Sequence, residues 1–241
     1  MRILVWDLPV RLFHWLLAGS FLAAFLIAVS TDDDGTLFPV HALFGLVMGF
    51  VVVLRLVWGF VGTTHARFTA FAWSPAALVA YLRDAFSPGA ARRWVGHNPG
   101  SSWASAVIFA CALGLGATGI AMSSGSEVAE EVHEVLAWTL LATVGAHLAG
   151  LAWHTLRHRE AIGLAMVDGR KVGDPGAAIR SARPLAGLAF LALTGAWTGG
   201  LVNGYDPATA TVTLPGIGTR IALGEGGEGG EGGDHHDDDD E

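Results

Sequence analysis

Five long apolar stretches constrain the fold of this 241-residue chain more than any other feature. A helix of about 20 apolar residues crosses the hydrocarbon core of a bilayer, whereas helices of a soluble core are shorter or amphipathic. The composition agrees, because a chain that is 52% hydrophobic and 15% charged has too few charges to cover a soluble domain. The sequence therefore predicts an all-α integral membrane protein. The expected membrane-spanning helices cover residues 12–30, 40–61, 102–122, 132–155 and 185–202.

Basic residues alternate between the segments that connect these stretches. Three segments carry arginine or lysine, and the two segments between them carry acids and no base. Because basic loops stay in the cytoplasm, the pattern predicts a cytoplasmic N-terminus and, after the fifth helix, an external C-terminal segment. The bases are Arg2 and Arg11, then Arg67, Arg83, Arg92 and Arg93, then Arg157, Arg159, Arg170, Lys171, Arg180 and Arg183. The acids are Asp32, Asp33, Asp34, Glu127, Glu130 and Glu131.

The chain divides into four parts by composition. A four-helix transmembrane bundle is expected first, followed by a basic connector, a fifth transmembrane helix and an acidic tail of low complexity. These parts are residues 1–172, 173–183, 184–203 and 204–241.

Three shorter segments carry local signals. Apolar residues at helical spacing over residues 74–86 predict an amphipathic helix that lies on the membrane surface. Residues 209–214 are β-prone. Residues 224–241 are a run of Gly, Glu and Asp that cannot bury apolar surface, so this end of the tail is expected to be disordered.

Cysteine use and charge exclude several classes of protein. The only cysteine, Cys111, lies inside the third expected helix, which excludes an internal disulfide and a cysteine-ligated cluster. The sequence has no C-x-x-C-H motif, so no c-type haem is attached covalently. The net charge of −8 comes mostly from the tail and gives no indication of nucleic-acid binding.

Histidines are the main polar residues inside the expected helices, and polar groups at membrane depth indicate a function. His14 lies at the cytoplasmic end of the first helix, and His41 lies at the outer end of the second. The fourth helix carries His133 near the outer face and His147 deeper. Their fourteen-residue separation corresponds to about 21 Å in depth and a rotation of about 40°. Both imidazoles therefore leave one face of the same helix.

These histidines match in two pairs by depth. His41 and His133 form an outer pair, and His14 and His147 form an inner pair. A low-spin haem iron takes two axial imidazoles from opposite sides, and the core of a four-helix bundle can supply them. The pattern predicts two b-type haems without an open iron position, an arrangement suited to electron transfer. By depth alone, His154 could replace His147 as the partner of His14.

A second class of function would use the same column of histidines. A haem-free transporter of metal ions or protons also places histidines at membrane depth. Metal sites in transporters usually include carboxylates, and Glu134 is the only acid within an expected helix. A visible spectrum of the purified protein distinguishes the two classes, because reduced bis-histidine haem has sharp α and β bands.

Small residues and one arginine accompany the histidines. Gly45 and Gly49 follow His41 at one and two helical turns, and Ala18 follows the first histidine at one turn. A flat macrocycle needs such a smooth stripe, although ordinary packing of small residues produces the same pattern. Arg55 lies on this stripe at the depth of the inner pair, where it could bind a haem propionate. Alternatively, its side chain extends to the cytoplasmic interface.

Several short motifs follow one another along the chain. They are Trp6-Asp7-Leu8-Pro9-Val10-Arg11-Leu12-Phe13-His14-Trp15, Val40-His41, Phe60-Val61-Gly62, Gly96-His97-Asn98-Pro99 and the pair of His133 and His147. In this order they resemble the bacterial cytochrome b561 family, and most closely its branch with the b-type cytochrome subunits of nickel–iron hydrogenases. The resemblance covers about residues 3–172. Each motif alone is weak, and their order is specific.

The resemblance implies a di-haem electron carrier of the bacterial inner membrane, with His14, His41, His133 and His147 as axial ligands. It favours His147 over His154. It also implies a partner at the membrane surface and exchange with the quinone pool. The leading interpretation is an electron-transfer subunit of an oxidoreductase that links a quinone or cytosolic donor to a periplasmic partner. The short outer loops, fifth helix and acidic tail differ from the hydrogenase subunits. These differences favour a periplasmic c-type cytochrome over a hydrogenase-like subunit as the partner.

Overall fold

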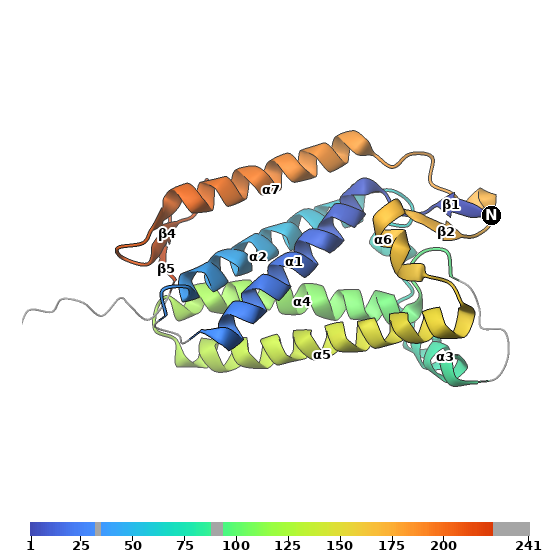
Figure 1. Cartoon of the computed structure of the whole chain (residues 1–241), viewed down its shortest axis with the longest axis horizontal. Helices are drawn as coiled ribbons and strands as arrows, with labels where there is room; N and C mark the ends of the chain where they lie inside the picture. Colours follow the sequence, from blue (N-terminus) through green and yellow to red (C-terminus); the bar gives the residue numbers. More distant parts are fainter. Residues whose placement is uncertain (32–34, 88–93, 224–241) are drawn as a thin grey trace, which may run out of the picture.

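The computed structural model describes residues 1–31, 35–87 and 94–223. Within these ranges, five helices are long and apolar enough to cross a membrane, which confirms the predicted helical membrane architecture. They run side by side in alternating directions (Figure 1). The five helices are α1 (Leu8–Ser30), α2 (Phe38–Val61), α4 (Pro99–Met122), α5 (Glu127–His158) and α7 (Pro184–Gly204).

Shorter elements lie at the two ends of these helices. The helix predicted over residues 74–86 is present as α3 (Pro75–Phe86), with Ser74 as its N-cap. The others are α6 (Ala165–Asp168), the 3-10 turns η1 (Phe68–Ala70), η2 (Ile162–Leu164) and η3 (Pro175–Ala177), and the strands β1 (Arg2–Leu4), β2 (Arg170–Val172), β3 (Tyr205–Asp206), β4 (Thr211–Thr213) and β5 (Arg220–Ala222).

Three of the long helices begin three to five residues earlier than their apolar stretches, because polar caps precede them. The side chain of Asp7 accepts a hydrogen bond from the Val10 amide, and Asn98 caps α4 in the same way. Ser126 caps α5, whose first turn is acidic and therefore complements the helix dipole. Hydropathy marks the apolar run of a helix, whereas capping decides where it begins.

The apolar side chains of the long helices face mainly outward. In α5, only 6% of the most apolar 18-residue window is buried inside the protein. Leu148 and Leu156 on this helix are 56% and 76% exposed. Such apolar surface is stable in lipid and not in water. The protein is therefore a multi-pass membrane protein.

Four helices form the bundle, and α7 packs outside it against α1 and α2. Close backbone approach joins α1 to α2, α2 to α4, and α4 to α5. Between α5 and either α1 or α2, the backbones hardly come within 8 Å. The residues that fill the centre of the bundle are Phe13, Met48, Val51, Val52, Phe109, Cys111, Ala112, Leu115 and Leu140.

A small sheet closes the end of the bundle at which the chain begins (Figure 1). Strand β1 pairs antiparallel with β2, which places Ile3 opposite Lys171. The connector packs here as well, since the Ile179 amide donates to the Leu4 carbonyl. We call this the basic end, because the described arginines of the three basic segments collect there. The sequence patterns predicted neither the strand pairing nor the packed connector.

The opposite end carries an antiparallel sheet of order β3-β4-β5. Its apolar side chains, including Val212 and Ile221, pack with Leu201 of α7 and Leu46 of α2. Burial of these alternating apolar residues orders the first part of segment 204–241, where composition indicated only a tail of low complexity. The β-prone segment 209–214 contains β4, and the run 224–241 lies outside the described residues.

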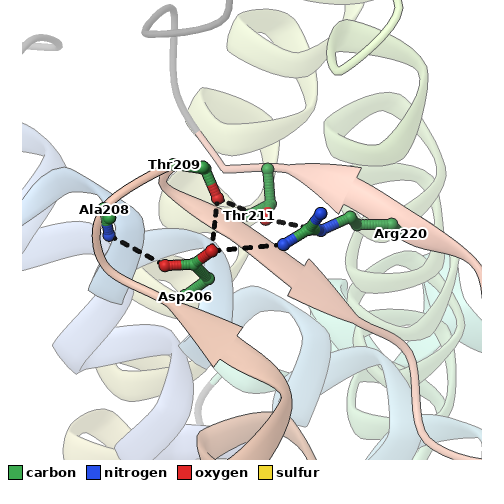
Figure 2. A network of polar contacts seen from close by, with 5 residues as sticks. All are labelled: Asp206, Ala208, Thr209, Thr211 and Arg220. Atoms are coloured by element: carbon green, nitrogen blue, oxygen red, sulfur yellow. Dashed lines mark hydrogen bonds and ion pairs between the residues drawn. The ribbon is translucent and has the colours of Figure 1, made fainter.

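A polar network holds the turns of this sheet together (Figure 2). Asp206 accepts hydrogen bonds from the Ala208 amide at 3.0 Å and the Thr209 hydroxyl at 3.0 Å. Arg220 forms an ion pair with Asp206 at 3.2 Å and donates to the Thr211 hydroxyl at 2.9 Å. The network ties the first strand of the sheet to the last.

Candidate functional site

The structure brings His41 of α2 and His133 of α5 together near the end of the bundle that carries the three-stranded sheet. Their ring centroids are 6.2 Å apart, with an angle of 62° between the rings. A metal–imidazole bond is about 2 Å long, so two axial imidazoles on one metal have centroids about 6 Å apart. The spacing of this pair therefore fits a bis-histidine metal such as a haem iron.

Hydrogen bonds define the proton position on both rings of this outer pair. Nδ1 of His41 lies 2.9 Å from the Ala24 carbonyl, which can only accept, so Nδ1 carries the proton. Nδ1 of His133 lies 2.9 Å from the Thr118 hydroxyl, which donates its own proton to the Gly114 carbonyl at 2.8 Å. With the hydroxyl proton on Gly114, we assign Nδ1 of His133 as the donor to Thr118. Each Nε2 keeps its lone pair, as a metal ligand requires.

The inner pair, His14 of α1 and His147 of α5, lies closer to the basic end. The two imidazoles are near enough for the charge of one to act on the other. Nδ1 of His14 is buried and has no hydrogen-bond partner among the described residues. A buried polar atom without a partner is costly unless a ligand satisfies it. The buried Nδ1 of His14 is therefore available to a bound group.

His154 lies nearer the basic end than either pair. Its ring contacts that of His158, with centroids 4.5 Å apart. Arg157, on the same turn of α5, donates to the Ala85 carbonyl at 2.8 Å and to the Ser87 carbonyl, so this end of α5 docks against α3. His154 thus sits in a histidine cluster where α5 ends.

The space around the histidine pairs suits a flat macrocycle. Both pairs join α5 to α1 or α2, which are the helices that hardly approach α5 closely. A methyl group added at Gly45 or Gly49 would meet no described atom within 4 Å. The small-residue stripe beside His41 therefore borders open space rather than a tight helix contact.

Arg55 is buried inside the bundle, with an exposed fraction of 2%, and does not extend to the membrane surface. Its Nη2 donates to the Ala66 carbonyl at 2.9 Å. Its guanidinium carbon lies 5.5 to 5.8 Å from the ring centroids of Phe13, Phe68 and Phe109. Its Nη1 is buried without a partner among the described residues. Arg55 therefore offers a charged donor to a group inside the protein.

A buried carboxylate, that of Asp7, lies near Arg55. Asp7 is fully buried and accepts hydrogen bonds from Trp58 Nε1 at 3.0 Å and from the Thr63 hydroxyl at 2.6 Å, besides capping α1. Its negative charge acts on Arg55. The sequence patterns did not predict this role for Asp7. The available signal was its place two residues before Pro9, at the start of an apolar run.

His97 was not predicted as a site residue either. Its ring lies 4.7 Å from that of Trp6 and 4.1 Å from that of Phe71. Burial, together with the nearby charges of Arg55 and Lys171, lowers the pKa of His97 to about 3. His97 is therefore neutral at physiological pH and serves as a packed polar residue beneath the N-terminal strand.

We expect the hydrogen bond from His133 to Thr118 to tune the outer site. Replacing Thr118 with Val removes the acceptor and lowers the basicity of the imidazole. Loss of such a partner typically weakens metal binding about 10- to 100-fold. Haem retention during dilution and the redox midpoint of the outer site measure the effect. Thr143→Val is the control, since the Thr143 hydroxyl bonds only a backbone carbonyl, at 2.7 Å. Equal retention in the two variants would contradict the assignment.

We also expect Asp7→Ala to destabilise the protein strongly. The change removes the cap of α1, leaves Trp58 and Thr63 without their acceptor, and removes the charge that compensates Arg55. These losses together cost about 3 kcal/mol. Denaturant titration of the purified protein measures the free energy of unfolding. Asp84→Ala, an exposed carboxylate on α3, should change it by less than about 0.5 kcal/mol. Similar values for both variants would contradict this role.

Together, the fold and these pairs define a class of protein. The protein has membrane-crossing helices, two histidine pairs along α5 and open space beside these pairs. These are features of a membrane-bound b-type cytochrome. A model of the family described as prokaryotic cytochrome b561 matches residues 5–169. The chain belongs to this family, which carries out electron transfer across the membrane with haem b.

A similar curated protein agrees with this assignment. It is a probable Ni/Fe-hydrogenase B-type cytochrome subunit from Rhizobium leguminosarum bv. viciae, 23% identical over 210 residues, covering 70% of this chain and 88% of the relative. No solved structure matches the chain. The family match ends at residue 169, so α7 and the C-terminal sheet lie outside it.

Proposed function

We propose that the protein is a di-haem electron carrier that links a quinone or cytosolic donor to a periplasmic redox partner. The observation that carries the proposal is the outer pair, with its 6.2 Å centroid spacing and both Nδ1 atoms engaged as donors. His41 and His133 would hold one haem b, and His14 and His147 the other. When bound, each haem supplies a one-electron redox centre.

The protein's own residues orient these ligands and set their charge environment. Ala24 and Thr118 fix the rings of the outer pair through Nδ1. Arg55 would bind a propionate of the inner haem, because its unpartnered Nη1 is buried at that level of the bundle. The ligand positions on α5 are separated by about 21 Å along the helix axis, so the two sites span most of the hydrocarbon core.

The pairing of the histidines also favours a cytochrome over a metal transporter. Within residues 1–31, 35–87 and 94–223, no three His, Cys, Asp or Glu side chains gather as a metal-ion site. The histidines form pairs, and two protein ligands alone do not complete the coordination of a bare metal ion. A porphyrin supplies four further nitrogen ligands.

The spectrum of the purified protein tests the proposal directly. We expect sharp α and β bands on reduction and two haems per chain in the pyridine haemochrome assay. The bis-histidine assignment also requires that carbon monoxide leave the reduced spectrum unchanged, because neither iron has an open position. A protein without haem, or with one haem per chain, would contradict the proposal.

The orientation of the chain supports a partner on the periplasmic side. The described arginines of the three basic segments collect at the basic end, which we assign to the cytoplasm. The opposite end carries Glu127, Glu130 and Glu131 at the start of α5 and would face the periplasm. A field of one sign increases the encounter rate of an oppositely charged carrier. A basic c-type cytochrome therefore fits this face better than a hydrogenase-like subunit does.

Ionic strength tests this partner. The rate of electron transfer from the reduced protein to a basic soluble c-type cytochrome should fall as salt rises, because salt screens exposed charges over about 10 Å at 0.1 M. Removing residues 224–241, which lie outside the described residues, should make the rate of electron transfer less sensitive to salt. A rate that is independent of salt and of the truncation would exclude electrostatic capture at this face.

A further inference from the structure

Two hollows meet at the basic end, beside the last turns of α5. The first is a cavity of about 210 Å³, which we call the basic pocket. Three of its lining residues are bases and one is an acid. They are Arg2, Arg170, Lys171 and Glu160.

The second hollow is an apolar groove of about 520 Å³ along the last turns of α5. Its lining includes Leu148, Leu151 and Leu156, with Gly163 of η2 on the other side. Ala161 and Leu164 line both hollows. The pocket and the groove therefore form one continuous site with a charged part and an apolar part.

The apolar and charged parts of the site follow the order of the tail and headgroup of a membrane lipid. Leu148 lies ten residues before the end of α5 at His158, which corresponds to about 15 Å along the helix. The apolar groove therefore extends into the hydrocarbon core, and the basic pocket lies at the level of the headgroups. Leu148, Leu156 and Leu164 are all more than half exposed, so they face the lipid and not the bundle core.

The charges in the pocket are only partly compensated. Arg2 pairs with Asp168 at 2.7 Å, and its side chain remains 51% exposed. Lys171 donates to the carbonyls of Trp94 at 2.9 Å and Gly96 at 3.3 Å. Burial lowers the pKa of Lys171 to about 8, against the opposing effect of Glu160, so the amine is still mainly charged at neutral pH. With Arg170, the pocket has three bases, against Glu160 in its lining and Asp168 beside Arg2.

We propose that this site binds one anionic phospholipid, with an acyl chain in the groove and the phosphate beside Arg2 and Arg170. Basic pockets next to membrane-spanning helices on the cytoplasmic side attract anionic headgroups. A quinone would also place its tail in the groove. Its headgroup is neutral, however, and would not compensate the excess of positive charge in the pocket. The proposal is independent of the haem ligands and does not depend on the assigned electron-transfer partners.

Native mass spectrometry of the haem-loaded full chain tests the charged part of the site. Phosphatidylglycerol and phosphatidylcholine are titrated separately into the protein in detergent, and bound lipid is counted. We expect tighter binding of phosphatidylglycerol. Arg170→Gln should weaken it roughly fivefold, as is typical for one basic residue at an anionic surface. Arg67→Gln, an exposed base at the same end but outside the pocket, is the control and should bind as the unmodified chain does.

A second variant tests the apolar part. A Cβ at Gly163 would lie 3.5 Å from Leu151 Cδ2, which is an ordinary contact. Gly163 lines the groove, so Gly163→Leu adds an apolar side chain there. It should abolish binding of phosphatidylglycerol while the haem content stays unchanged. Gly150→Leu adds the same side chain on α5 where a Cβ meets no described atom within 4 Å, and it should bind lipid normally.

Three outcomes would overturn the proposal. The first is equal affinity for phosphatidylglycerol and phosphatidylcholine. The second is unchanged binding of phosphatidylglycerol by Arg170→Gln or by Gly163→Leu. The third is displacement of phosphatidylglycerol by ubiquinone at equal concentration, which would assign the site to quinone instead.

Discussion

Replacing His41 or His133 with Ala is expected to reduce the haem content from two haems per chain to one. A bis-histidine haem loses an axial bond in either variant, and the remaining imidazole cannot hold the cofactor in a six-coordinate, low-spin state. The inner pair lies about 21 Å away along α5 and should retain its haem. The pyridine haemochrome assay gives the stoichiometry. Electron transfer to a periplasmic acceptor should fall sharply, because the outer site is removed.

The double variant of His41 and His133 makes this expectation sharper. If the two histidines bind the same haem, the double variant still retains one haem, and its spectrum matches that of either single variant. Two separate sites would instead lose both haems together. Glu134→Gln, next to His133 on the exposed side of α5, is the matched control and should retain both haems. Retention of two haems in the single variants would show that the outer ligands are wrongly assigned.

The second large effect is expected at the inner pair. His147→Ala should abolish the inner haem, because His14 then has no partner across the bundle. His154→Ala should leave the spectrum almost unchanged, since His154 packs against His158 beyond the level of the pair. The comparison of these two variants on one helix controls for changes in the helix itself. Loss of the inner haem in His154→Ala, with retention in His147→Ala, would make His154 the ligand.

The levels of the histidines were predictable because helix geometry is local. A residue's depth follows from its position in an apolar run at about 1.5 Å per residue, and its direction follows from about 100° per residue. Those two rules predict that His41 lies beside His133, and the centroids of these rings are 6.2 Å apart. The assignment of the four histidines as haem ligands remains a prediction.

The surroundings of the histidines could not be predicted in the same way. Thr118 lies fifteen residues before His133 on another helix, and Ala24 lies seventeen residues before His41. Nothing in the local pattern marks either residue as a hydrogen-bond partner. Such partners depend on how two helices rotate against each other, which the packing of the whole bundle decides.

The contacts at the two ends of the protein could not be predicted from local patterns either. Arg2 and Arg170 are 168 residues apart and meet in the sheet of the basic end, and Asp7 meets Thr63 across 56 residues. The sequence indicated β propensity at residues 209–214, but only burial against α2 and α7 made this segment part of an ordered sheet.

The sequence by itself determined the membrane class, the five helices, the alternation of charge and the depth of each histidine, because hydropathy and helical period act over a few residues. Only the tertiary structure decided which polar groups satisfy one another, where Arg55 points and how the ends are closed. These features depend on contacts between distant segments, whose cost in chain entropy is offset only when the whole bundle forms.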